Sequence, residues 1–345
     1  MPASAVDVIR PAFDHTVRQL FKPFRLGQWV RLAITGLLAG ELGTPGGCSA
    51  QIPWRPPNRS DQLLAQAVIP RSGLWFAAIV LLVLLALVLV IALIYISSRM
   101  RFVLFDSVVA KECHIRRYWA QRTGPAFRYF AFQLLLIMAI TGAVAFFASI
   151  AAIIAFLTGW LRNPRQHVIP LILVGTVFFL FIAAFLIIAF LVAVLTKDFV
   201  VPQMALEDLT VAEGWRRLWA GLMSEKGGFA GYVGMKIVLT IAATIAEGIA
   251  ALIVVLALLI PIGFVALIIV LGARAIGIAW NVFTISVAIV AGCIVLAAVI
   301  FGVLLISVPV IVFFPAYSIY FFATRYPALS TVLYPPVPPP EPAGG

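Results

Sequence analysis

Residues 171–195 read LILVGTVFFLFIAAFLIIAFLVAVL, and none of these side chains carries a charge. The hydrocarbon core of a bilayer is about 30 Å thick, and an α-helix needs about 20 apolar residues to cross it. The stretch is therefore long enough and apolar enough to predict a membrane-spanning helix.

The rest of the chain repeats this pattern. The apolar run around residues 171–195 extends over 168–196, and four similar runs cover 73–97, 127–158, 229–260 and 286–314. A weaker sixth candidate begins at Trp29, continues to about residue 43 and contains Glu41. Only 11% of all residues are charged, whereas a soluble domain carries about 25%. The fold class that we predict is an all-α membrane bundle of about six helices.

The basic residues predict the orientation of these spans. With six spans, 17 of the 24 Lys and Arg residues fall on the side that also holds both termini, and six fall on the opposite side. Cytoplasmic loops carry the excess of Lys and Arg. We therefore expect a multi-pass protein of the bacterial cytoplasmic (inner) membrane with both termini in the cytoplasm. Because the basic residues flank apolar runs, they do not indicate nucleic-acid binding.

A faint repeat suggests how the spans are grouped. Segments rich in Phe, Trp and Arg leave one span and lead into the next, for example around residues 101–119 and 198–219. The repeat predicts three related hairpins, each introduced by a cytoplasmic amphipathic segment. The expected domains are an amphipathic arm at 1–28, a six-helix domain at 29–328 and a Pro-rich disordered tail at 329–345. Residues 43–59 are expected to form a turn-rich external loop.

Two segments have the periodicity of amphipathic helices. Thr210 and Glu213 have the spacing of a capping box, which predicts a helix start, and an apolar face follows at Val211, Trp215, Leu218, Trp219, Leu222 and Met223. A second stripe runs along Phe13, Val17, Leu20, Phe21 and Phe24. Such helices can lie among lipid headgroups, or they can pack against the end of the bundle.

These segments supply the candidate interfacial residues. Trp side chains favour the membrane boundary, and Arg side chains attract anionic headgroups. The candidates for contact with lipid or with a partner are Trp29, Arg31, Arg116, Arg117, Trp119, Trp215, Arg216, Arg217 and Trp219. The expected partners are anionic membrane lipids, with a membrane protein or a second copy of the chain as further options.

Catalytic and metal-binding motifs are not found in the sequence. It contains no HExxH, GxSxG or Gly-rich phosphate loop. The histidines His15, His114 and His167 fall in separate segments, and the cysteines Cys48, Cys113 and Cys293 are widely spaced. We therefore predict no catalytic residue, no metal and no cofactor.

One ionisable residue lies near the middle of a predicted span. Placing the Glu247 side chain there costs about 2.5–3.5 kcal/mol even on the lenient insertion scale, so it is a functional candidate by default. It either binds a cation or polar substrate, as in a transporter or lipid translocator, or forms a hydrogen bond to a neighbouring helix. Lys236 is expected to extend to the cytoplasmic headgroups.

The chain also resembles a known group of membrane proteins. The segment Trp29-Val30-Arg31-Leu32-Ala33, and the exit Phe199-Val200-Val201-Pro202 before Trp215-Arg216-Arg217, are similar to a bacterial and archaeal membrane-domain superfamily. That superfamily includes the membrane domain attached to some glycerophosphodiester phosphodiesterases. The resemblance covers only their membrane part, and it implies six helices without an assigned activity. The amphipathic segments, the few polar groups within the predicted spans and the absence of a catalytic motif favour a non-enzymatic scaffold or accessory protein over a transporter.

Overall fold

The fold is known from a computed structural model. It describes residues 3–41, 73–160, 167–275 and 281–334, and in this part of the chain all regular secondary structure is helical. The all-α prediction is therefore confirmed for these residues. The predicted external loop at 43–59 and most of the predicted tail lie outside them.

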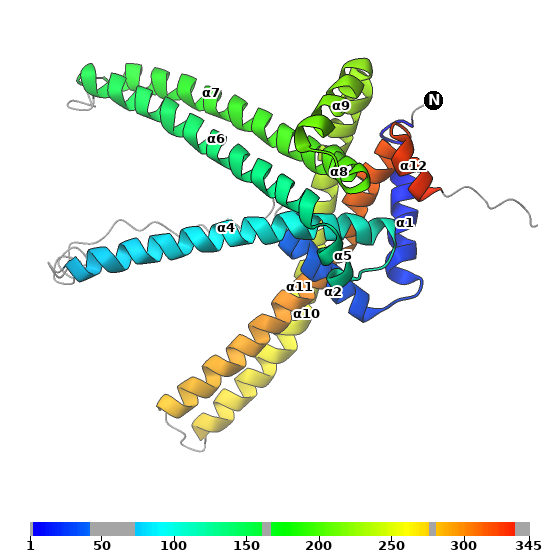
Figure 1. The fold of residues 1–345 in the computed structure, drawn as a ribbon. Coiled ribbons are helices and arrows are strands. Elements are labelled where there is room, and N and C mark those ends of the chain that lie inside the picture. Colours follow the sequence, from blue (N-terminus) through cyan, green and yellow to red (C-terminus); the bar gives the residue numbers. More distant parts are fainter. Residues whose placement is uncertain (1–2, 42–72, 161–166, 276–280, 335–345) are drawn as a thin grey trace, which may run out of the picture.

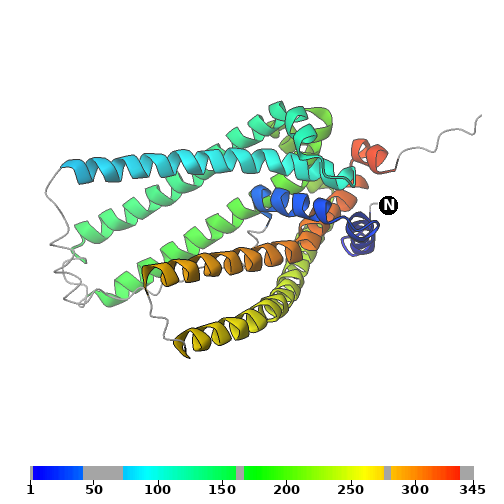
Figure 2. The ribbon, with the colours of Figure 1, turned by 90° about the horizontal axis from the view of Figure 1, so that it is seen from below.

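Within these described residues, five helices are long and apolar enough to cross a membrane. They are α4 (Gly73–Val109), α6 (Thr123–Leu157), α7 (Val168–Leu195), α10 (Lys226–Ala275) and α11 (Val282–Ala323). Each covers one of the five long apolar runs to within one residue. Helix α6 lies beside α7 and α10 lies beside α11 in both views (Figures 1 and 2). The most apolar stretch of each long helix is not buried inside the protein, so lipid is the solvent that suits it, and the chain is a multi-pass membrane protein.

Short helices gather where the long helices converge (Figures 1 and 2). These are α1 (Ile9–Phe21), α2 (Leu26–Ala39), α5 (Ile115–Gln121), the π-helical turn η2 (Thr196–Val200), α8 (Val201–Glu207), α9 (Val211–Ser224) and α12 (Pro327–Leu333). We call this part of the protein the base, and the apolar parts of the long helices that diverge from it the arms.

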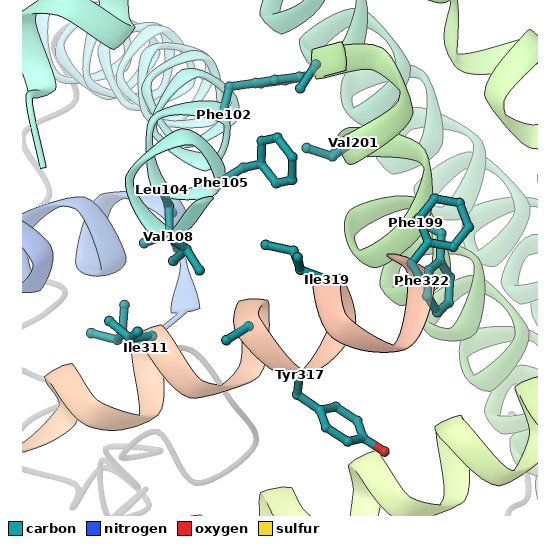
Figure 3. Close-up of a cluster of buried hydrophobic side chains, with 14 of the residues drawn as sticks. Phe102, Leu104, Phe105, Val108, Phe199, Val201, Ile311, Tyr317, Ile319 and Phe322 are labelled. Carbon is teal, nitrogen blue, oxygen red and sulfur yellow. The ribbon is translucent and has the colours of Figure 1, made fainter. Parts of the chain in front are cut away.

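The buried core lies in the base. Figure 3 shows that it is built from the last turns of α4, from η2 and α8, and from the C-terminal half of α11. Phe102, Phe199 and Phe321 are fully buried, and the Tyr232 and Tyr317 rings stack with centroids 5.3 Å apart. Full burial of one large apolar side chain stabilises a fold by about 1.5–3 kcal/mol, so this core stabilises the junction from which the arms extend.

The candidate sixth span differs from the other five. Helix α2 has 14 residues, which correspond to a length of about 21 Å at 1.5 Å per residue. It packs beside the C-terminal half of α4, because Arg101 Nη2 donates to the Ala39 carbonyl (3.0 Å) and Gln28 Nε2 donates to the Lys111 carbonyl (3.0 Å). Helix α2 therefore belongs to the base and is shorter than the membrane core. The count of six spans stays a prediction.

Both predicted amphipathic helices form, but only one of them buries its apolar face in the base. The capping box of Thr210 and Glu213 is confirmed, and α9 buries Val211 and Leu218 in the base. Helix α1 instead buries a largely polar face that includes His15 and Gln19. Its predicted apolar stripe is mostly exposed at Phe13, Phe21 and, beyond the helix end, Phe24.

Helix α10 continues through Pro261 to Ala275. The prediction that Lys236 extends to the headgroups is wrong. Its ammonium group turns to the Asp198 carboxylate of η2, which takes part in the core of the base.

Candidate functional site

A basic pocket opens on the flank of the base. It has a volume of about 560 Å³ and is lined by Arg31 of α2, by His114, and by the first turn of α5 with Ile115, Arg116 and Arg117. Three of the arginines selected from sequence thus meet at one place, although Arg31 lies 85 residues before Arg116.

The two walls of this pocket are fixed by backbone contacts. Arg31 Nη1 donates to the Cys113 carbonyl (3.4 Å), which joins α2 to the turn before α5. Trp29 Nε1 donates to the Leu20 carbonyl (3.0 Å), and the Trp29 ring contacts the Phe21 and Phe24 rings at 5.5 Å. These contacts fix the first two turns of α2 against the turn before α5 and against the end of α1.

The pocket is strongly positive. None of its three arginines forms an ion pair with a carboxylate of the described residues. Glu112 Oε2 lies 3.8 Å from Nδ1 of His114, which lines the pocket. Guanidinium groups stay charged at all physiological pH values and present several donors in a plane, which matches the oxygens of phosphate and carboxylate. The arrangement can hold an anionic group of small-molecule size.

The aromatic candidates have mostly structural positions. Trp119 packs under the Arg99 guanidinium, which lies 4.8 Å from the ring centroid. Trp215 Nε1 donates to Thr196 Oγ1 of η2 (2.9 Å), so Trp215 anchors α9 to the base. Trp219, in contrast, leaves 54% of its surface exposed.

The basic candidates on α9 lie outside the basic pocket. Arg216 is exposed, and Arg217 Nη1 pairs with Glu207 Oε2 at 2.5 Å. The structure therefore places the nominated residues in two groups, one at the basic pocket and one along α9.

Glu247 is half-buried on α10, and its carboxyl group interacts with the Ser307 hydroxyl of α11. A carboxyl group beside a hydroxyl group of a neighbouring helix is typical of a packing contact. Within the residues that the structure describes, no group of three or more His, Cys, Asp or Glu side chains could hold a metal ion.

The sequence analysis missed a second charged site. Five ionisable side chains from four segments of the chain meet where the arms leave the base, and we call them the ionic layer: Glu41, Arg101, Lys197, Asp198 and Lys236. Lys197 pairs with Glu41, and Lys236 pairs with Asp198, which also accepts a hydrogen bond from the Tyr232 hydroxyl (3.0 Å). The adjacent Lys197 and Asp198 at the end of an apolar run were the available signal.

A π-helical turn presents two members of the ionic layer. Lys197 and Asp198 belong to η2, in which the helix of α7 widens before α8 begins. Such insertions rotate side chains relative to a regular helix and are frequent at functional sites. Here the turn directs Lys197 to Glu41 and Asp198 to Lys236, so that residues adjacent in sequence bind different elements.

The comparison with known families gives one result. The model of a family of unknown function, DUF7544, matches residues 3–332, which is nearly the whole chain. The chain therefore belongs to that family. No curated protein and no solved structure matches it. The match does not test the resemblance to the membrane domain of glycerophosphodiester phosphodiesterases, which stays a prediction.

Proposed function

We propose that this member of DUF7544 is a non-enzymatic membrane scaffold or accessory protein, and that its base binds the anionic headgroup of a membrane lipid. The observation that carries the proposal is the basic pocket, in which Arg31, Arg116 and Arg117 converge without carboxylate partners among the described residues. A phosphodiester headgroup offers the charge and the planar oxygen pairs that guanidinium groups bind best.

The proposal includes an orientation. The base carries most of the basic residues and lies at the cytoplasmic face of the cell membrane, and the arms point into the bilayer. Both termini are cytoplasmic and the chain crosses the membrane six times, in line with the distribution of Lys and Arg. In this orientation the basic pocket lies on the side where anionic lipids attract basic residues.

The exposed aromatic residues of the N-terminal segment support the same role. Phe13, Phe21 and Phe24 are 50–59% exposed, and basic side chains at Arg18, Lys22 and Arg25 lie among them. Apolar rings beside cations are suited to contact with a headgroup region or with a partner protein. A second copy of the chain or another membrane protein is thus the further partner that this surface would fit.

The test is lipid retention. The protein is extracted in mild detergent, exchanged into mixed micelles of phosphatidylglycerol and phosphatidylcholine, and analysed by native mass spectrometry. Replacement of Arg31, Arg116 and Arg117 by Gln should abolish preferential retention of phosphatidylglycerol. The matched control replaces Arg10, Arg128 and Arg274, three exposed arginines outside the basic pocket, and should keep it. Equal retention in both variants would contradict the proposal, and a stoichiometric protein partner without lipid would favour the partner role.

The alternative function is a transporter or lipid translocator that uses Glu247. The interaction of Glu247 with Ser307 supports a packing role more than a transport role. Reconstituted vesicles decide between them, since Glu247→Gln should leave lipid translocation and solute flux unchanged in a scaffold and abolish them in a transporter.

A further inference from the structure

The ionic layer surrounds a small cavity. The cavity has a volume of about 30 Å³ and lies between α4, the η2–α8 segment and α11. Glu41, Arg101, Lys197 and Asp198 line it together with Ser318, and the rest of its wall is apolar. It is separate from the basic pocket, with which it shares no lining residue.

Charge in the ionic layer is unbalanced. Two lysines face two carboxylates in the pairs Lys197–Glu41 and Lys236–Asp198. Arg101 is the third cation, and no carboxylate of the described residues lies within ion-pair distance of it. Because a guanidinium group does not lose its proton, the five groups together carry one net positive charge.

Arg101 is also incompletely hydrogen-bonded. Its Nη1 donates to the Tyr129 hydroxyl and its Nη2 to the Ala39 carbonyl (3.0 Å), and both acceptors are neutral. Its Nε is buried and has no acceptor among the described residues. A buried cation that has no carboxylate within ion-pair distance, and a buried donor without an acceptor, are both costly. The missing ion pair and the missing acceptor both concern the Arg101 side chain, which lines the cavity.

The size of the cavity limits which group could supply Arg101 with both an anionic partner and a hydrogen-bond acceptor. A site for one water molecule requires roughly 10–15 Å³, so a cavity of about 30 Å³ has room for a body of about that size. A single halide ion fits such a space.

We propose that this cavity binds one monovalent anion of halide size, held by Arg101 and Lys197. The anion neutralises the net charge of the ionic layer and supplies the missing acceptor for Arg101. The Glu41 and Asp198 carboxylates do not prevent binding, since each is already compensated by a lysine. The bound anion joins α4 to the η2 turn, and thereby stabilises the junction from which the arms diverge. This inference does not depend on lipid binding at the basic pocket.

The test measures thermal unfolding of the purified protein in a neutral detergent at constant ionic strength. Sodium chloride or sodium bromide is compared with sodium gluconate, whose anion is too large for the cavity. Both halides should raise the melting temperature in a saturable way. Arg101→Gln should lose this dependence, while Arg10→Gln, at an exposed position of α1, should retain it.

A second measurement covers the case in which Arg101→Gln does not fold. Crystals of the unaltered protein grown in bromide should show one anomalous peak within about 3.5 Å of the Arg101 guanidinium, a distance typical of a charge-assisted contact. A melting temperature independent of the anion, or bromide absent from the cavity, would overturn the proposal. Stabilisation by phosphatidylglycerol in place of halide would overturn it as well, because the counter-charge would then come from a lipid.

Discussion

At the scale of single residues, the base is held by polar groups that no hydropathy pattern reveals. His15 of α1 is 3% exposed, with Nε2 at 2.9 Å from the Val108 carbonyl and Nδ1 at 3.1 Å from the Tyr320 hydroxyl. One imidazole ring thus joins α1 to both α4 and α11. The apolar stripe of α1, from which the sequence analysis argued, contributes much less to this contact.

This position makes the base sensitive to acid. Burial lowers the pKa of the His15 imidazole below its ordinary value of 6.5, and the nearby Lys111 and Arg18 act in the same direction. The native state therefore binds fewer protons at His15 than the unfolded state does, so stability is present above pH 6.5 and falls as the pH drops below it.

The measurement is the melting temperature between pH 7.5 and 5.5. The unaltered protein should lose stability over this range, and His15→Gln should show a flatter dependence. His114→Gln is the matched control, since the His114 side chain is 54% exposed, and it should follow the unaltered protein. The same slope in His15→Gln would show that this imidazole does not carry the acid sensitivity.

At the scale of elements, hydropathy located the long helices but not their full lengths. The run 73–97 predicted a span that stops before Ser98, yet α4 continues to Val109. The added turns contain Arg99 and Arg101, whose guanidinium groups contact Trp119 of α5 and Tyr129 of α6. Since these partners are distant in sequence, local periodicity cannot supply them.

The capping box at Thr210 and Glu213 shows the opposite case. Both of its hydrogen bonds form within four consecutive residues, so the sequence alone predicts the start of α9. The basic pocket could be predicted from the sequence only in part. Its arginines were identifiable individually as candidates, but the meeting of Arg31 with Arg116 and Arg117 depends on how α2 packs against the base.

The close contact between α2 and α11 gives a test at this scale. A Cβ atom at Gly36 would lie 2.5 Å from Ile311 Cγ2, whereas one at Gly27 of the same helix would meet nothing within 4 Å. Gly36→Ala should destabilise the protein by about 1–3 kcal/mol, as overpacking does. Gly27→Ala should be neutral or stabilise by up to about 1 kcal/mol through helix propensity.

Unfolding by urea or heat in detergent measures this pair of variants. Equal stabilities of Gly36→Ala and Gly27→Ala would mean that α2 does not pack against α11 as described. The comparison is controlled for residue type, because both variants make the same chemical change in one helix.

At the scale of the whole molecule, the base and the arms differ in composition and in the surroundings that suit them. The base contains the buried core, the ionic layer and the basic pocket, and the arms present apolar side chains to their surroundings. Such a division suits a protein whose arms are solvated by lipid while its base contacts headgroups. The account therefore depends on one claim, that the base lies on the cytoplasmic side of a membrane crossed by the arms.

Labelling of single cysteines tests this claim most directly. With Cys48, Cys113 and Cys293 replaced by Ser, one cysteine is introduced at Thr158, at the far end of α6, or at Ser224, at the end of α9; both positions are exposed. In intact cells a membrane-impermeant maleimide should label the Thr158→Cys variant, and it should label the Ser224→Cys variant only after the membrane is opened. Labelling of Ser224→Cys in intact cells, or of both variants alike, would contradict the account.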